Sequence, residues 1–221
     1  MTSSSQTQQQ EGFIYVSSNN PSIEDTTTKL LHQKYLFVTC PSPRCIELFL
    51  ETVRSSRTSI YCAFFDIDQP FLLDALEQKR KAGVDVSMVV DGDQYDQKND
   101  YSFLIFEDKS SYMHNKFCIF DERVVMTGTW NTTKRGTFEN NNTVLYLYDK
   151  DIAHTYKNEF DELENGIYGG GETTDQFRFI LNNTEMKQVE IYFCPEDWCV
   201  SQIIRHLRKA RKSISFETFS F

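Results

Sequence analysis

The chain has 221 residues, 39% of them hydrophobic and 25% charged, which is typical of a globular domain. No apolar run approaches the roughly 18–20 residues that span a bilayer, so we expect no transmembrane segment. The net charge of -9 repels polyanions from the average surface and favours a local basic site over a long phosphate-binding groove. The first 28 residues lack Lys and Arg, which argues against a signal peptide or presequence and predicts a cytoplasmic protein.

The first half of the chain alternates strand and helix patterns. Residues 1–30 are rich in Ser, Thr, Gln and Asn and are predicted to form a disordered polar tail. The apolar periodicity then predicts strands over 35–39, 59–65 and 84–91, and helices over 44–56 and 70–81. This βαβαβ order predicts an α/β fold with a parallel or mixed β-sheet flanked by helices.

The second half begins with a polar, loop-like stretch over 95–111 that contains a short apolar piece at 103–106. Two close apolar runs, separated by Asp121 and Glu122, predict a β-hairpin. A strand over 143–148, a helix over 152–163 and a Gly-rich linker over 166–188 follow. Residues 31–165 are therefore predicted to form one domain.

An internal repeat links the two ends of the chain. The CPxxxC motif of residues 40–45 recurs at residues 194–199, an offset of 194 − 40 = 154. The same offset aligns residues 57–60, Arg-Thr-Ser-Ile, with residues 211–214, Arg-Lys-Ser-Ile. Residues 189–221 are therefore predicted to begin a second, incomplete copy of the first domain.

The six cysteines allow several interpretations. Without a visible signal peptide they are predicted to be reduced thiols, or in part metal ligands. The two CPxxxC motifs could bind zinc together, form two local disulfides or cap two helices with buried thiols, and we favour a structural role. Cys62 and Cys118 fall in predicted strands, where a cysteine is typically a small core residue.

The residues best suited to chemistry are His114 and Lys116. On a strand they point to one face, with Asn115 on the other. An ammonium neutralises phosphate oxygens while a neutral imidazole attacks phosphorus or transfers a proton. Asp121 follows at the strand end, where a carboxylate could orient either group. In the alternative interpretation, His and Lys lie on a solvated face and Asp121 only forms a turn.

A second turn, Gly-Thr-Trp-Asn, follows the hairpin. Thr129 and Asn131 are potential donors to the same phosphate, and Lys134 would add positive potential for a flanking phosphate. The complete spacing, HxKxxxxD followed by six residues and Gly-Thr, makes the solvated-face interpretation the weaker one.

The segments 112–121 and 126–131 resemble the phospholipase D superfamily signature, HxKxxxxDxxxxxxG(S/T), in particular its nuclease-like and mitochondrial cardiolipin hydrolase-like branch. The resemblance covers about residues 35–165 and the start of a second copy at 189–221. It implies the mixed sheet of that family and a site made of two HxK motifs that pair across a twofold axis.

The resemblance also implies roles for individual residues. One histidine forms a phosphohistidine while the other protonates the leaving oxygen and activates water. His114 would be the nucleophile or its acid/base partner, Lys116 and Asn131 would hold the phosphate, and Asp121 would support the histidine pair. The chemistry implies no metal and no cofactor. The sequence holds one complete motif, so a homodimer or a second HKD half is expected to complete the site.

These patterns predict a metal-independent phosphodiester hydrolase, with nucleic acid as the first substrate. The alternatives are a phospholipase D or cardiolipin hydrolase that acts on an anionic phospholipid, and a non-catalytic phosphate-binding fragment or partner subunit.

Overall fold

The computed structural model describes residues 12–18, 34–94, 101–107, 112–172, 178–179 and 186–216. The strands of the large sheet are β2 (Tyr35–Cys40), β3 (Ser59–Phe64), β4 (Asp85–Asp91), β5 (Leu104–Glu107), β6 (Lys116–Phe120), β7 (Val124–Gly128) and β8 (Asn142–Tyr148). Within the described residues they form a mixed sheet in the order β2-β8-β7-β6-β3-β4-β5. The β3–β4 and β4–β5 pairs are parallel and the others are antiparallel.

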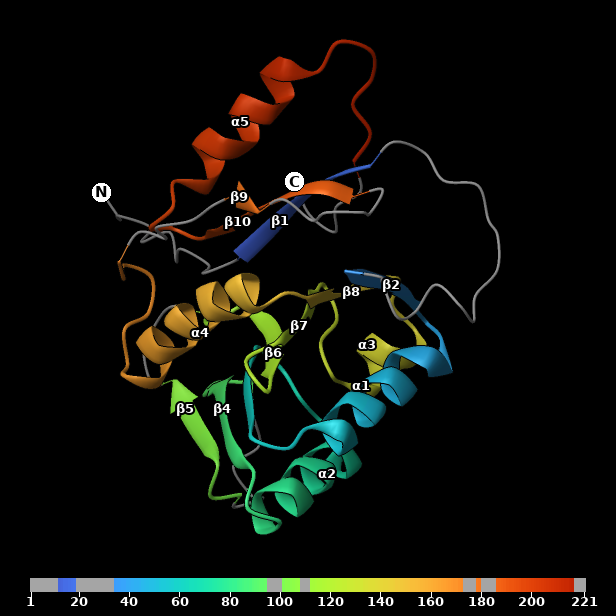
Figure 1. Ribbon diagram of the computed structural model, residues 1–221, viewed down its shortest axis with the longest axis vertical. Helices are drawn as coiled ribbons and strands as arrows, with labels where there is room; N and C mark the ends of the chain where they lie inside the picture. Colours follow the sequence, from blue (N-terminus) through green and yellow to red (C-terminus); the bar gives the residue numbers. More distant parts are fainter. Residues whose placement is uncertain are drawn as a thin grey trace, which may run out of the picture.

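Helices cover both faces of this sheet (Figure 1). Helices α1 (Pro43–Ser55), α2 (Pro70–Lys81) and α3 (Lys134–Phe138) lie on one side, and α4 (Lys150–Glu164) lies on the other. Beyond α4 is a small sheet of β1 (Gly12–Ser18), β10 (Met186–Phe193) and β9 (Arg178–Phe179), followed by α5 (Cys199–Lys209). The predicted α/β class with a mixed, helix-flanked sheet is confirmed.

Alternating residues of the central strands form two cores. Phe64 and Phe120 pack toward α1 and α2, whereas Ala63 and Ile119, one position earlier on the same strands, pack toward α4. This period of two, with apolar residues at both positions, is typical of a strand buried on both faces. The helix starts follow local rules as well, since Pro70 occupies the first turn of α2 and the Asp149 carboxylate accepts the Asp151 N–H at the start of α4.

One segment differs from the predicted disordered tail. Residues 12–18 form β1, which pairs antiparallel with β10 from Gly12 opposite Phe193 to Ser17 opposite Gln188. The segment contains Phe-Ile-Tyr-Val, a run with high β propensity, but its partner strand lies far away in sequence, so local composition did not reveal it. The rest of residues 1–30 lies outside the described residues, and the domain boundaries stay predictions.

The internal repeat has a structural counterpart. The pair β10–α5 repeats the order of β2–α1, with a cis Cys–Pro bond and a disulfide between strand and helix in both copies. The second strand predicted for the second copy is not formed over residues 211–216, and residues 217–221 lie outside the described residues.

The prediction of reduced thiols or zinc ligands is wrong, because all six cysteines are paired. The bonds are Cys40–Cys45, Cys62–Cys118 and Cys194–Cys199. Cys62 and Cys118 are buried as expected, but they lie opposite each other in the β3–β6 register with 4.1 Å between their Cα atoms. Of the three interpretations of the CPxxxC motifs, local disulfides are the one observed.

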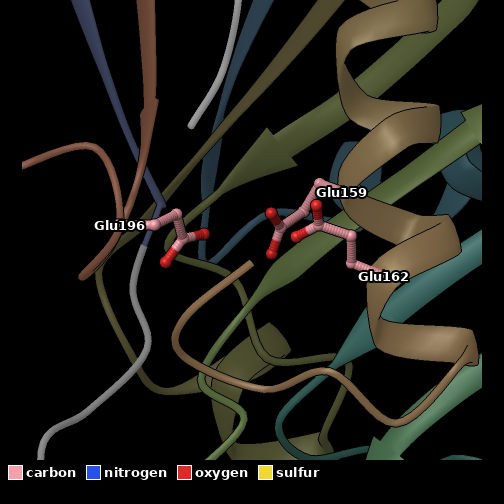
Figure 2. Close-up of side chains that lie close together, drawn as sticks. All are labelled: Glu159, Glu162 and Glu196. Atoms are coloured by element: carbon pink, nitrogen blue, oxygen red, sulfur yellow. The ribbon is translucent and has the colours of Figure 1, made fainter. Parts of the chain in front are cut away.

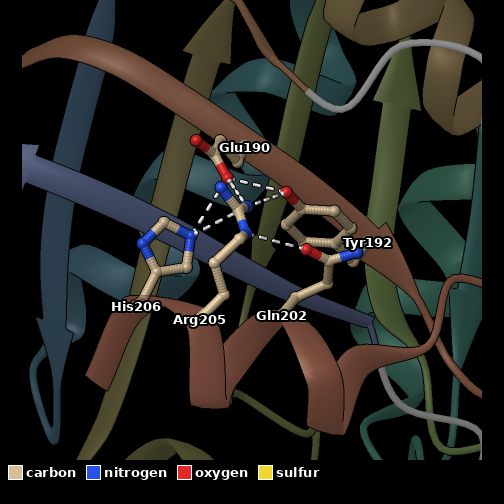
Figure 3. A network of polar contacts seen from close by, with 5 residues as sticks. All are labelled: Glu190, Tyr192, Gln202, Arg205 and His206. Atoms are coloured by element: carbon tan, nitrogen blue, oxygen red, sulfur yellow. Dashed lines mark hydrogen bonds and ion pairs between the residues drawn. The ribbon is translucent and has the colours of Figure 1, made fainter. Parts of the chain in front are cut away.

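A buried ion-pair network attaches α5 to β10 (Figure 3). The Glu190 side chain is 1% exposed and its Oε2 accepts hydrogen bonds from the Arg205 guanidinium at 2.5 Å and the Tyr192 hydroxyl at 2.6 Å. His206 Nε2 lies 3.0 Å from the same oxygen, and Gln202 accepts from Arg205 Nε. Burial raises the pKa of Glu190, but these donors outweigh it and lower the pKa to about 2.

We expect this network to fail in acid. The lowered pKa means that Glu190 stabilises the fold fully above its usual pKa of about 4.5, and that this contribution disappears as the pH falls toward 2. Its size is on the order of 2–3 kcal/mol. Hydrogen exchange of β10 and α5 amides should show a stability difference between wild type and Glu190→Gln at pH 7 that vanishes near pH 2. A stability difference of the same size at pH 7 and near pH 2 would contradict the role assigned to ionised Glu190. The exposed Glu47→Gln on α1 serves as the control.

Candidate active site

The strand directions bring four chain segments to one edge of the large sheet. The parallel strands β3 and β4 end at this edge, the antiparallel β6 begins there and β7 ends there. The residues at these positions are Asp66, Asp91, His114, Lys116 and Asn131. The carboxyl ends of parallel strands are a common place for binding sites in α/β proteins.

His114 and Lys116 share one face, as the sequence predicted. The His114 ring lies edge-on to the Phe65 ring at 4.6 Å between centroids, and Lys116 Nζ lies 5.3 Å from the centroid of the same ring. Lys116 Nζ also donates to the His114 backbone carbonyl at 2.8 Å. Asn115 points to the opposite face, where its amide donates to Glu159 at 3.4 Å. The side chains of His114 and Lys116 are half-buried, so a ligand can reach them.

Asp91 holds the backbone just before the histidine. Its buried carboxylate accepts the N–H of Met113 at 3.1 Å and that of Asp93 at 3.1 Å. Burial raises the pKa of Asp91, although these backbone donors lower it in part. Asp91 is not among the residues predicted from the sequence, although its position at the end of a buried strand could have indicated it.

Asp66 adds a carboxyl group to the same edge. Burial and the nearby Asp68 raise the pKa of Asp66, and the charge of Lys116 opposes that change. Lys116 therefore lies within electrostatic range of an acid that holds its proton more tightly than usual. Asp68 itself accepts the backbone N–H of Lys134 at 2.7 Å and ties the start of α3 to this edge.

The turn after β7 places Asn131 beside the site. Gly128 has a φ of 148° and lies so close to the Thr143 carbonyl that a Cβ would collide with it. Gly136 passes equally close to the backbone carbonyl of Asn131. Asn131 Oδ1 is buried and accepts no hydrogen bond from any residue that the structure describes. A ligand donor or an ordered water would satisfy this oxygen.

Two of the predicted phosphate-binding residues are placed less favourably. The Thr129 hydroxyl donates to Asn142 at 3.0 Å and accepts the Thr143 N–H at 3.0 Å, so it already connects the turn to β8. Lys134 is exposed at the start of α3. Binding of a phosphate by Thr129 would require its hydroxyl to leave Asn142, whereas the Lys134 side chain is free to approach a flanking group.

The prediction that Asp121 supports the histidine is wrong for this chain. Asp121 follows the far end of β6, a strand about 16 Å long, whereas His114 precedes its start. There its carboxylate accepts the backbone N–H groups of Arg57, Thr58 and Ser59 at 2.7–3.1 Å, and the Thr58 hydroxyl at 2.9 Å. Burial raises the pKa of Asp121, but these donors prevail and lower it. The alternative interpretation, a turn residue, describes it correctly.

Asp121 and Glu122 have positive φ values of 52° and 49°, and the Arg123 N–H donates to the Phe120 carbonyl at 3.0 Å. Two consecutive positive φ values are typical of the tight hairpin turns that match strand twist. The predicted hairpin is thus confirmed.

The edge combines an imidazole, an ammonium and an amide whose carbonyl oxygen is unpaired among the described residues, and such a set can bind and attack a phosphorus centre. Within the described part of the chain, His114 is the one imidazole at this edge. None of the described helices is both long and apolar enough to cross a bilayer.

Comparison with known proteins agrees with this chemistry. The family model described as "Cardiolipin synthase, PLD-like domain" matches residues 49–164, and the chain belongs to this phospholipase D-like phosphodiesterase family. The mitochondrial cardiolipin hydrolase of Xenopus tropicalis is 31% identical over 136 residues, covering 56% of this chain and 64% of that protein. The protein of that name from Chlamydomonas reinhardtii is 26% identical over 130 residues, 55% of this chain and 58% of its own length. The match thus spans less than two thirds of either relative.

Among solved structures, Nuc of Salmonella typhimurium, a phospholipase D family member, superposes with a TM-score of 0.52 at 22% identity. The superposition covers 60% of this chain and 94% of Nuc, which shows that the two share a fold.

Proposed function

We propose that the chain supplies one half of a metal-independent phosphodiester hydrolase. A His114 ring nitrogen attacks phosphorus, a P–N bond forms and the P–O bond to the leaving oxygen breaks. A histidine of a second half protonates that oxygen, and then removes a proton from the water that cleaves the P–N bond. Lys116 and Asn131 bind the non-bridging oxygens. The observation that carries this proposal is the packing of His114 and Lys116 around one ring, that of Phe65, at the sheet edge.

The exposed face of α5 supports the existence of a second half. Its apolar side chains Val200, Ile203, Ile204 and Leu207 are exposed. At the repeat offset of 154 residues they correspond to four residues of α1, of which Phe49 and Val53 are buried in the core and Ile46 and Leu50 pack against it. We infer that a second phospholipase D-like half, whether from another copy of this chain or from the same polypeptide, covers this face as the large sheet covers α1.

We propose single-stranded nucleic acid as the first substrate. Tyr112 is 38% exposed and packs edge-on against Phe65, with 5.6 Å between ring centroids, directly beside His114. Exposed aromatic rings next to a phosphate site are suited to stacking of unpaired bases. An anionic phospholipid is the second candidate, because the matched relatives are named mitochondrial cardiolipin hydrolases.

One pair of assays separates the two substrates. In the presence of a chelator, at a temperature where the protein stays folded, we expect cleavage of a labelled single-stranded DNA but no release of phosphatidic acid from cardiolipin liposomes. Tyr112→Ala should raise KM for DNA about tenfold, equivalent to the roughly 1–3 kcal/mol of one stacked base. The exposed Phe138→Ala on α3 is the control and should leave KM unchanged.

Cleavage of cardiolipin with no effect on DNA would favour the lipid candidate. Binding of either substrate without turnover, even with the second half present, would instead indicate a non-catalytic phosphate-binding subunit and contradict the proposed hydrolase.

A further inference from the structure

Three glutamates converge behind the active-site strand (Figure 2). Glu159 and Glu162 lie one turn apart on α4, and Glu196 belongs to the turn that connects β10 to α5. One carboxylate oxygen from each lies within 4.8 Å of the others. The cluster therefore joins the first domain to the start of the second repeat.

Burial makes the negative charge of these carboxylates energetically unfavourable. Glu159 is 5% exposed, and both carboxylate oxygens of Glu196 are buried without a hydrogen-bond partner among the residues that the structure describes. Burial, followed by the negative neighbours, raises the pKa of Glu159, and burial is also the largest cause that raises the pKa of Glu196. A buried, unpaired carboxylate requires either a proton or a cation.

A single shared proton does not neutralise the cluster. Glu159 and Glu196 lie close enough for one protonated carboxyl to donate to the other, but Glu162 then remains. Glu162 accepts the Glu172 N–H at 2.8 Å, so this carboxylate already has one backbone donor. The buried Asp197, which accepts the Phe193 N–H at 2.7 Å, adds a further acid nearby.

The oxygen spacing suits a hard cation. Ca²⁺ binds carboxylate oxygens at about 2.3–2.6 Å, so ligands on opposite sides of the ion lie about 5 Å apart and adjacent ones lie closer. We propose that Glu159, Glu162 and Glu196 bind a structural Ca²⁺ ion that joins the second-repeat turn to α4. Water would complete the coordination shell, since three side chains leave positions open.

A cation at this site would stabilise the start of β6 from the α4 side of the sheet, without contacting substrate. Glu159 accepts the amide of Asn115, which lies between His114 and Lys116 and immediately precedes β6. A cation bound at Glu159 would therefore hold Asn115 on the α4 side of the sheet. His114 and Lys116 would then stay on the opposite side. Its role is structural, so it is separate from the metal-independent chemistry proposed above.

The test uses the full chain, freed of metal by a chelator that is then removed. Titration with CaCl₂ in a calorimeter should show one ion bound per chain. The Tm should rise by about 5–10 °C at a concentration about 100 times Kd. Glu196→Gln should weaken Ca²⁺ binding at least tenfold and abolish the rise in Tm. Glu164→Gln, on the same helix but hydrogen-bonded to Ser87, is the matched control and should bind like wild type.

Glu162→Gln, at a half-exposed position, provides a second variant if Glu196→Gln does not fold. Two results would overturn the proposal. One is binding of Mg²⁺ or Zn²⁺ without Ca²⁺. The other is a Tm that does not respond to any added cation but falls as the pH rises, which would assign the cluster to a shared proton.

Discussion

Replacing His114 with alanine is expected to lower phosphodiesterase activity by at least about 10⁴-fold, because in the proposed mechanism it removes the group that forms the covalent bond to phosphorus. The Tm should change little, since the ring lies at the sheet edge, where it packs edge-on against Phe65. Steady-state rates on the preferred substrate and a thermal unfolding curve measure both effects. His154→Ala, an exposed histidine on α4, is the control and should keep full activity.

The same variant tests how the second half is supplied. If two copies of this chain form one site, an equal mixture of wild type and His114→Ala after subunit exchange should retain about one quarter of the activity. About one half would remain if each chain acts alone or carries its own second half. A strictly monomeric 221-residue chain with full activity would contradict the two-half site.

Asp121→Ala is expected to destabilise the fold by about 2–3 kcal/mol, or about 5–10 °C in Tm. The substitution leaves three backbone N–H groups and one hydroxyl at the start of β3 without their charged acceptor. The kcat of the folded protein should stay within about twofold of wild type, because Asp121 lies at the opposite end of β6 from His114. Thermal unfolding and kcat measured well below Tm separate the two effects.

Glu122→Gln provides the control, because it removes a charge from the same turn without removing an acceptor of these bonds. A loss of more than about 100-fold in kcat at an unchanged Tm would show instead that Asp121 takes part in the reaction.

The sequence predicted the elements of the first domain well, because their apolar periodicity and terminal residues agree. Helix α2 begins and ends where the pattern 70–81 placed it, and the hairpin turn lies at Asp121 and Glu122. Strand β1 was missed because β pairing depends on a distant partner, and α3 because five residues are too few to show a period. The cysteine pairing was mispredicted because the pairs depend on sheet register and on the turn between strand and helix, which cysteine spacing alone does not determine.

The arrangement of the candidate site was predicted in part, and the catalytic roles of its residues stay predictions. His114 and Lys116 were found because alternation on one strand determines their common face. Asp121 was misplaced because a motif gives the order of residues but not the strand that separates them by about 16 Å. Asp91 and Glu159 come from other strands and helices, and their proximity to the motif depends on sheet order and on α4 docking, which a single sequence does not reveal.

The Cys62–Cys118 bond covalently joins β3 to β6, two positions before Lys116 pairs with Phe64. A slip of this pairing by one residue would turn His114 and Lys116 toward α4 and bring Asn115 to the ligand side. The crosslink forbids that slip even when the surrounding loops open. The two side chains proposed to act on phosphorus therefore keep one alignment relative to β3, even where the surrounding loops change.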